Sequence, residues 1–78
     1  MTSERPIRDV MADLVREIFE LDPTQNIADD LDVGHLGDSL QQLELISAIE
    51  GRFGIALEVE ELPGFADLVV LVTGHVSP

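Results

Sequence analysis

The residues of this chain that could carry chemistry gather in the stretch HLGDSLQQLELISAIE, which covers residues 35–50. Ser39 offers a hydroxyl group that could either attack a substrate or be modified by another enzyme. A nucleophilic serine needs a base held against its hydroxyl and a third group that orients the base. The only histidines are His35 and His75, and His35 lies just before Ser39 in a predicted loop. This arrangement disfavours a hydrolase centre at Ser39.

The letters Gly37-Asp38-Ser39-Leu40 also resemble the opening of the signature block in a family of serine esterases. That resemblance implies a doubly wound sheet, with the serine after its first strand, in a much longer domain. A chain of 78 residues buries only about 60% of the surface that its unfolded form exposes. The segment ADDLDVGH, just before the motif, is acidic and rich in turn residues rather than apolar. An esterase therefore stays a remote alternative.

The composition argues against a metal site. The chain has no cysteine, so it can form neither a disulfide nor a thiolate metal site. The segment DPTQNIADDLDV has some features of a calcium-binding loop. However, Ile27 stands where such a loop needs glycine, and Val33 stands where it needs its closing glutamate. We expect no metal ligand set in this chain.

Acidic residues outnumber basic residues by 16 to 4, which gives a formal net charge of −12. Such a surface repels nucleic-acid phosphates and anionic lipids, and it attracts basic protein surfaces. No stretch resembles a signal peptide or approaches the roughly 18 apolar residues of a membrane span. We therefore expect a cytoplasmic monomer that binds proteins and has neither nucleic acid nor a membrane as a partner.

Apolar periodicity predicts a first helix over residues 4–20, which Asp22 and Pro23 end. Residues 22–37 form a predicted loop that is long for a compact domain, and such loops usually have a function. Four apolar residues of this loop are expected to pack on the core: Ile27, Leu31, Val33 and Leu36. No repeat or linker divides the sequence, so we expect one domain over residues 1–78.

A second helix is predicted to begin beside Ser39. Asp38 is a favoured N-cap residue, and Gln41 three positions later suits a capping box. Gly54 follows Phe53 as a stop signal. The expected core stripe comprises Leu40, Leu43, Ile46, Ile49 and Phe53, and Leu45 and Ala48 widen it. Leu40, at the start of the helix, is equally well placed for partial exposure. The residues expected to face mostly solvent are Gln41, Gln42, Glu44, Ser47 and Glu50.

The last third of the chain is ambiguous from pattern alone. The segment IALEVEEL alternates apolar and acidic residues, and FADLVVLV is an apolar run rich in β-branched residues, so a hairpin across Pro63-Gly64 is possible. The other interpretation is a short helix over residues 59–62 and a final helix over residues 66–73. A lone two-stranded ribbon is marginally stable, which favours the helices.

The stretch DDLDVGHLGDSLQQLELISAIEGRFGIALEVEEL resembles the central part of the acyl carrier protein family, and the likeness extends over nearly the whole chain. The matching features are Asp38-Ser39-Leu40 at the start of the second helix, Leu43-Glu44-Leu45 within it, Phe53 at its end and an apolar-acidic stretch after it. The resemblance implies an all-α, four-helix bundle of acyl-carrier type, with a long loop between helices one and two and a short third helix.

The resemblance further implies that Ser39 is not a nucleophile but the attachment point of 4′-phosphopantetheine, which a phosphopantetheinyl transferase adds. The protein would then be no enzyme itself. It would carry acyl groups as thioesters and present them to biosynthetic enzymes with basic docking surfaces. The residues expected to contact those partners are Asp38, Leu40, Glu44 and Glu50.

Some positions depart from the pattern of fatty-acid carriers. Gly51-Arg52 replaces acidic residues near the end of the second helix, and Ser47 replaces a large apolar residue. These departures favour a free-standing carrier of polyketide or other specialised cargo over a housekeeping fatty-acid carrier. An aminoacyl, peptidyl or D-alanyl carrier remains an alternative. A small acidic interaction bundle without a prosthetic group is the alternative of another class.

Overall fold

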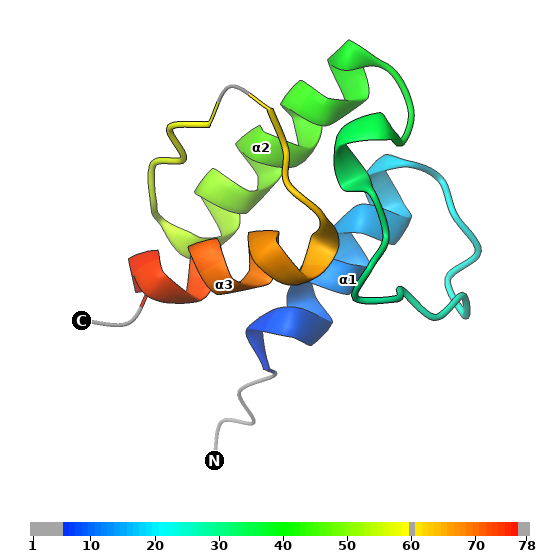
Figure 1. The fold of residues 1–78 in the computed structure, drawn as a ribbon, viewed down its shortest axis with the longest axis horizontal. Helices are drawn as coiled ribbons and strands as arrows, with labels where there is room; N and C mark the ends of the chain where they lie inside the picture. Colours follow the sequence, from blue (N-terminus) through cyan, green and yellow to red (C-terminus); the bar gives the residue numbers. More distant parts are fainter. Residues whose placement is uncertain (1–5, 60, 77–78) are drawn as a thin grey trace.

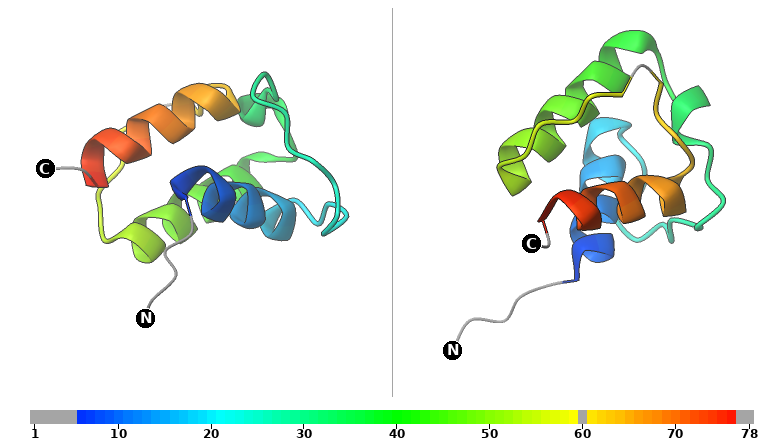
Figure 2. Two further views of the ribbon diagram at one scale, coloured as in Figure 1. Left: turned by 90° about the horizontal axis from the view of Figure 1, so that it is seen from below. Right: turned by 60° about the vertical axis from the view of Figure 1, so that its left-hand side comes forward.

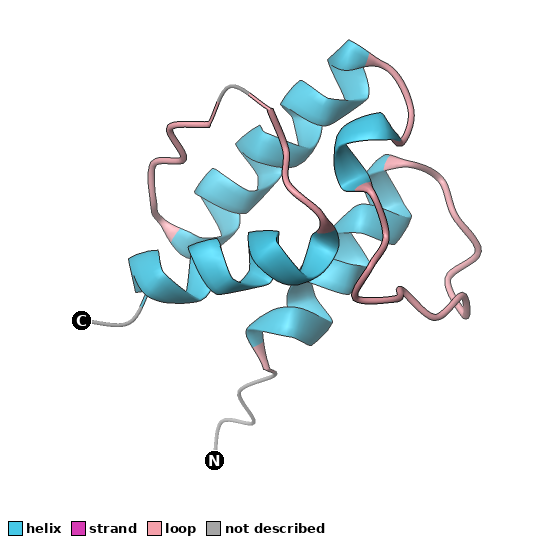
Figure 3. Ribbon diagram, viewed as in Figure 1, coloured by secondary structure: helices cyan, strands magenta, loops and turns pink. Residues whose placement is uncertain are grey.

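The computed structural model describes residues 6–59 and 61–76 of the chain. Within this part the elements are helix α1 (Ile7–Ile18), the 3-10 turn η1 (Val33–His35), helix α2 (Ser39–Phe53) and helix α3 (Phe65–Val76). The described residues contain no strand (Figures 1 and 3). The all-α prediction is confirmed, and the tail that could have formed a hairpin contains α3 instead.

Helix α1 packs against both α2 and α3, and Figure 2 shows the three helices from two further sides. Pro6 caps its start, which suits a residue that has no N–H to leave unpaired. The helix ends at Ile18, two residues before the predicted end, and Glu20 follows with a φ of 55°. The predicted start at Glu4 lies outside the described residues.

One apolar core joins the three helices and the loop between α1 and α2. Ile27 and Val33 of this loop are buried, while Leu31 and Leu36 are half-buried against the same core. The predicted packing of the loop is therefore confirmed. The largest fully buried side chains come from every part of the fold: Met11, Val15, Ile27, Val33, Leu45, Ile49, Phe65, Leu68 and Val72.

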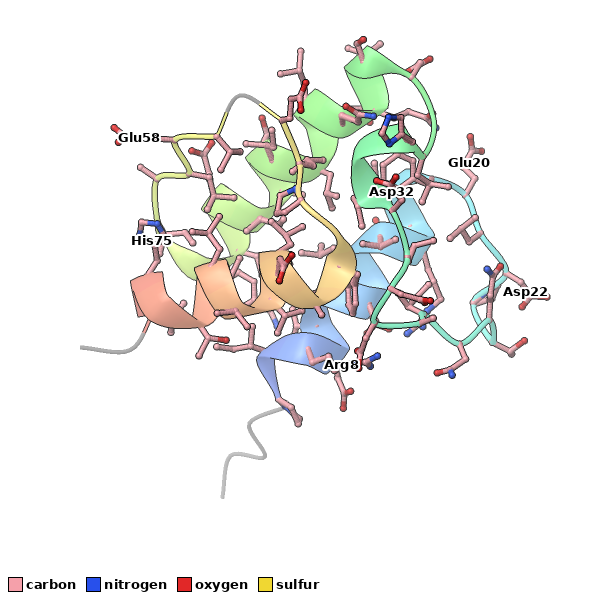
Figure 4. The ribbon with its side chains drawn as sticks, viewed as in Figure 1. Arg8, Glu20, Asp22, Asp32, Glu58 and His75 are labelled. Atoms are coloured by element: carbon pink, nitrogen blue, oxygen red, sulfur yellow. The ribbon has the colours of Figure 1, made fainter. Side chains whose placement is uncertain are left out.

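Two arginines of α1 hold the long loop in place. The Arg8 guanidinium donates to Asp29 Oδ1 at 2.7 and 2.9 Å and to the Ile27 carbonyl at 2.7 Å, and it lies 5.2 Å from the centre of the Phe65 ring. Figure 4 shows Arg8 between α1 and the loop. Arg16 donates to the Gln25 carbonyl at 2.8 Å. The loop thus has a defined course across the bundle.

The start of α3 adds further hydrogen bonds to the same loop. The Phe65 N–H donates to the Leu31 carbonyl at 2.9 Å, and the Ala66 N–H donates to the Asp29 carbonyl at 3.0 Å. These bonds satisfy N–H groups that the first turn of a helix leaves without an intrahelical partner. The loop is therefore bonded to α1 on one side and to α3 on the other.

The predicted short helix over residues 59–62 is not formed by Val59, Glu61 and Leu62, and Glu60 lies outside the described residues. The segment between α2 and α3 crosses the bundle as an irregular strap (Figure 1). Ile55, Leu57 and Val59 alternate with outward-facing residues and pack toward the core. This two-residue period suits extended backbone better than helix. Pro63 comes directly after the four residues of the predicted short helix. In residues 6–59 and 61–76 the bundle therefore has three α-helices and a 3-10 turn, without the short helix that was predicted.

Candidate functional site

Ser39 is the first residue of α2, and its side chain is exposed. Asp38 precedes it in extended conformation and caps the helix: the Gln41 N–H donates to Asp38 Oδ1 at 2.9 Å. In return, the Asp38 N–H donates to Gln41 Oε1 at 3.2 Å. The predicted capping box is confirmed, and it fixes the backbone on both sides of Ser39.

The backbone around Ser39 suits an anionic substituent. The Gln41 N–H is used by the cap and the Gln42 N–H donates to the Asp38 carbonyl, whereas the Ser39 and Leu40 N–H groups have no acceptor among the described residues. Unpaired N–H groups and the positive end of the helix dipole favour negative charge at this position. A phosphate ester on the Ser39 hydroxyl would lie beside these groups, so the residues present fit such a group.

Gly37 makes the sharp turn into α2 possible. Its φ is 69°, which an L side chain rarely adopts, and a Cβ placed on it would come within 2.7 Å of the Phe19 ring. Phe19 is buried just after α1, so its ring lies directly beneath the turn. The close approach of Gly37 to Phe19 places Ser39 on the surface immediately above the core.

Gln41 and Gln42 are half-buried, so the prediction that they face mostly solvent is wrong. Gln41 Nε2 donates to the Ile18 carbonyl at the end of α1, at 3.4 Å. Gln42 Nε2 donates to the carbonyls of Gly34 and Leu36 in the loop. The two amides therefore tie the first turn of α2 to both segments that precede it.

Leu40 and Leu43 are exposed, at 65% and 61%. The predicted place of Leu43 in the core stripe is wrong, and of the two alternatives for Leu40 the structure shows the exposed one. Each step of three residues falls about 60° short of a full helical turn. Three such steps separate Leu40 from the buried Ile49. The side chains of these two residues therefore point to opposite sides of the helix. Leu40 and Leu43 instead lie on the outer face of α2, beside Ser39.

The other residues predicted to contact partners differ in their surroundings. Asp38 and Glu44 are exposed, whereas Glu50 is half-buried. Glu50 Oε2 accepts a hydrogen bond of 2.8 Å from the Leu57 N–H, which ties the strap to α2. Asp38, Leu40 and Glu44 thus lie together near the start of α2, and Glu50 holds a backbone group three turns further along the helix.

His35 and His75 are not brought together. His35 Nδ1 is 2.7 Å from Asp32 Oδ2, and both side chains are exposed. His75 lies at the other end of the molecule, in the last turn of α3, as its distance from Asp32 in Figure 4 shows. The hydrogen bond of His35 therefore goes to Asp32, and none joins it to Ser39 in the described part of the chain.

Among residues 6–59 and 61–76, no three histidine, cysteine, aspartate or glutamate side chains gather in a way that could hold a metal ion. Within the same residues, each helix is too short or too polar to cross a membrane.

Residues 7–72 match the model of a family described as "Phosphopantetheine attachment site". No curated protein and no solved structure matches the chain. The matched segment covers most of the chain, including α1, α2, Ser39 and most of α3.

Proposed function

Because the chain belongs to the phosphopantetheine attachment site family, we propose that Ser39 is the residue on which it carries its prosthetic group. Domains of this family are non-catalytic carriers that hold 4′-phosphopantetheine covalently on a serine. The observation that supports Ser39 is its place: an exposed hydroxyl at the first residue of a capped helix, beside two backbone N–H groups that have no acceptor in the described part of the chain.

The residues of the chain position the group rather than react with it. The arm supplies a terminal thiol for thioester formation, which this cysteine-free chain cannot provide itself. The Ser39 hydroxyl is the point of attachment, and the Ser39 and Leu40 N–H groups stabilise the phosphate charge. Gly37 and the Asp38 cap hold this turn at the surface, where a separate transferase can reach the hydroxyl.

We assign the cargo to the acyl class, with polyketide or other specialised intermediates favoured over housekeeping fatty acids. Gly51-Arg52 and Ser47 support this assignment, because they replace the acidic and large apolar residues that fatty-acid carriers have there. An aminoacyl, peptidyl or D-alanyl carrier is the second candidate of the same fold. We also propose that the carrier works in the cytoplasm, where the terminal thiol of the arm stays reduced.

The partners of such a carrier are a phosphopantetheinyl transferase and the enzymes that load and use its cargo. We propose that they approach the start of α2 with basic surfaces and contact Asp38, Leu40 and Glu44. The net charge of −12 supports this, because it attracts basic surfaces over several ångströms before contact. We include Glu50 as a contact at the edge of this docking surface, because its carboxylate also accepts the hydrogen bond from the Leu57 N–H.

Intact-mass measurement after coexpression with a broad-specificity phosphopantetheinyl transferase tests the assignment of Ser39. We expect the wild-type protein to gain the mass of one 4′-phosphopantetheine group and Ser39→Ala to gain none. Ser47→Ala is the matched control, because Ser47 is another exposed serine of α2. Wild-type protein without a mass gain, or modified Ser39→Ala, would show that the assignment is wrong.

A further inference from the structure

A recess of about 160 Å³ lies beside the first turns of α2. It is formed where three segments meet: the turn η1, helix α2 and the strap that leads to α3. The lining residues are Gly34, His35, Gln42, Glu61 and Leu62. Gln42 follows Ser39 by three residues, so both side chains project from neighbouring positions on α2. The recess is therefore next to the site of modification.

The hydrogen bonds around Gln42 determine which of its atoms can bind a ligand. Its side-chain nitrogen faces the carbonyl oxygens of Gly34 and Leu36, which can only accept. The assignment of nitrogen and oxygen in this amide therefore follows from its partners. No described group donates to Gln42 Oε1. This oxygen is left as an acceptor.

Glu61 adds acceptors of the same kind. Its side chain is exposed and supplies carboxylate oxygens. His35 on the same rim donates from Nδ1 to the Asp32 carboxylate, and its Nε2 accepts when the ring is neutral and donates when it is charged. Gln42 and Glu61 thus present acceptors to the recess, with negative charge on one wall. A phosphate would be repelled there, whereas hydroxyl and amide N–H groups would be bound.

We propose that this recess binds the hydroxyl and amide N–H groups of the pantetheine arm after its attachment to Ser39. The inference rests on the proposed function, because it assumes the arm on Ser39. The phosphate and the pantetheine donors of the arm then have separate binding sites. The phosphate stays at the N–H groups that begin α2, and the donors that follow it along the arm bind the acceptors of the recess.

Gly34 keeps the two walls of the recess together. A Cβ on Gly34 would come within 2.5 Å of the Leu62 carbonyl oxygen, so η1 and the strap approach each other more closely than any other residue would allow. Gln42 holds the same turn from the side of α2 through the Gly34 carbonyl. The shape of the recess therefore depends on Gly34 and its polarity on Gln42, His35 and Glu61.

The test uses the full chain, modified in vitro with coenzyme A and a transferase, with labelled protein and NMR detection. We expect nuclear Overhauser contacts between the arm's amide or hydroxyl protons and residues Gln42, Glu61 or Leu62. Glu61→Lys replaces an acceptor with a donor and should remove these contacts. The arm's amide signals should then show the narrow lines and slow transverse relaxation of a mobile chain.

Glu58→Lys is the matched control, because it changes the charge equally on the same strap. Glu58 does not line the recess, and Figure 4 shows it pointing outward from the strap. This variant should keep the contacts, while Gly34→Ala should weaken them by separating the walls. Fully modified wild-type protein without contacts, or Glu61→Lys with unchanged contacts, would overturn the inference. Failure of the modification itself would instead contradict the assignment of Ser39, as intact mass would show.

Discussion

Two amide side chains next to Ser39 have roles that carboxylates of the same length could not fill. Gln41 accepts from the Asp38 N–H and donates to the Ile18 carbonyl, and Gln42 donates to the Gly34 carbonyl. A glutamate can accept but not donate when ionised. In a chain with 16 acidic residues, glutamine at both positions is thus explained by the carbonyl groups that surround the start of α2.

Asp22, at the start of the long loop, makes a contribution to folding stability that depends on pH. Its Oδ1 accepts from the Thr24 N–H at 2.8 Å and from the Thr24 hydroxyl at 2.7 Å. The backbone bond first, and the hydroxyl bond second, lower the pKa of Asp22 below its usual value. A lowered pKa means that Asp22 stabilises the fold above the pKa of the unfolded chain. This contribution is lost as the pH falls through the folded pKa.

Thr24→Val should raise the pKa of Asp22 toward its usual value, because it removes the hydroxyl donor and keeps the backbone donor. Carbon-detected NMR titration of the carboxyl groups measures this shift directly. Thr73→Val is a suitable control, since the Thr73 hydroxyl bonds to the Val69 carbonyl within α3. An Asp22 pKa that is the same in wild type and Thr24→Val would contradict the role of the hydroxyl.

Helix α2 divides its glutamates between two tasks. Glu44 is exposed on the outer face, whereas Glu50 accepts from the Leu57 N–H and ties the strap to the helix. Leu57 is buried, so its N–H has poor access to water if the carboxylate is removed. The same residue type thus serves the surface near Ser39 and the internal structure near the end of the helix.

Glu50→Ala should lower the free energy of unfolding by about 1–3 kcal/mol, the usual cost of a partly buried donor without an acceptor. Glu44→Ala removes an exposed carboxylate and should change stability by less than about 0.5 kcal/mol. Urea denaturation of both variants measures the difference, and alanine suits either helical position. Equal stability of the two variants would show that the bond to Leu57 contributes nothing.

Glu44→Lys tests the outer face of α2 as a docking surface. Lysine keeps helix propensity but repels a basic partner, so modification of Ser39 by the transferase should slow by about three- to tenfold at low salt. Glu17→Lys makes the same charge change at an exposed position of α1 and should slow the reaction less. Rates are compared by mass spectrometry over time, with melting temperatures unchanged. Equal rates for wild type and Glu44→Lys would remove Glu44 from the docking surface.

The elements that local chemistry determines could be predicted from the sequence. The start of α2 follows from Asp38 and Gln41, because a capping box involves only four consecutive residues. The resemblance around Ser39 also predicted a phosphopantetheine carrier, and the family match confirms that much, while the acyl-carrier type stays a prediction. The cargo and the docking residues stay predictions.

The errors had local and distant causes. The i, i+3 spacing placed Leu43 in the core, although this spacing drifts around the helix, and its face of α2 has no covering element in the described fold. Gln42 and Gly34 were missed because their partners lie in other segments, and only the closeness of η1 to the strap reveals them. The alternation in residues 55–59 was the signal that could have corrected the predicted short helix.

At the scale of the whole molecule, the charge is far from balanced. Arg8 forms an ion pair with Asp29, and Arg16 forms one with Asp13. The sequence has only two further basic residues, against 16 acidic residues in all. The carboxylates repel one another across a small surface, and dissolved ions screen that repulsion. The folded state, which holds these charges closest together, gains most from screening.

Added salt, or Mg²⁺ or Ca²⁺ in the millimolar range, should therefore raise the melting temperature without any structured metal site. A gain of about 1 kcal/mol corresponds to about 4–8 °C for a domain of this size. Thermal melts across ionic strength, followed by circular dichroism, measure the effect. Midpoints that stay constant or fall with added salt would contradict this account of the charge.

The two arginines that connect α1 to the loop also determine how the molecule opens. Arg8 and Arg16 lie two turns apart on one helix and bind the loop backbone at Ile27 and Gln25. Local opening costs more free energy where a segment is bonded to a packed helix. The loop can leave its place only when α1 gives up these bonds. Under the proposed function, partner enzymes would therefore approach Ser39 on a fixed loop and helix, and the movement needed for delivery would come from the arm.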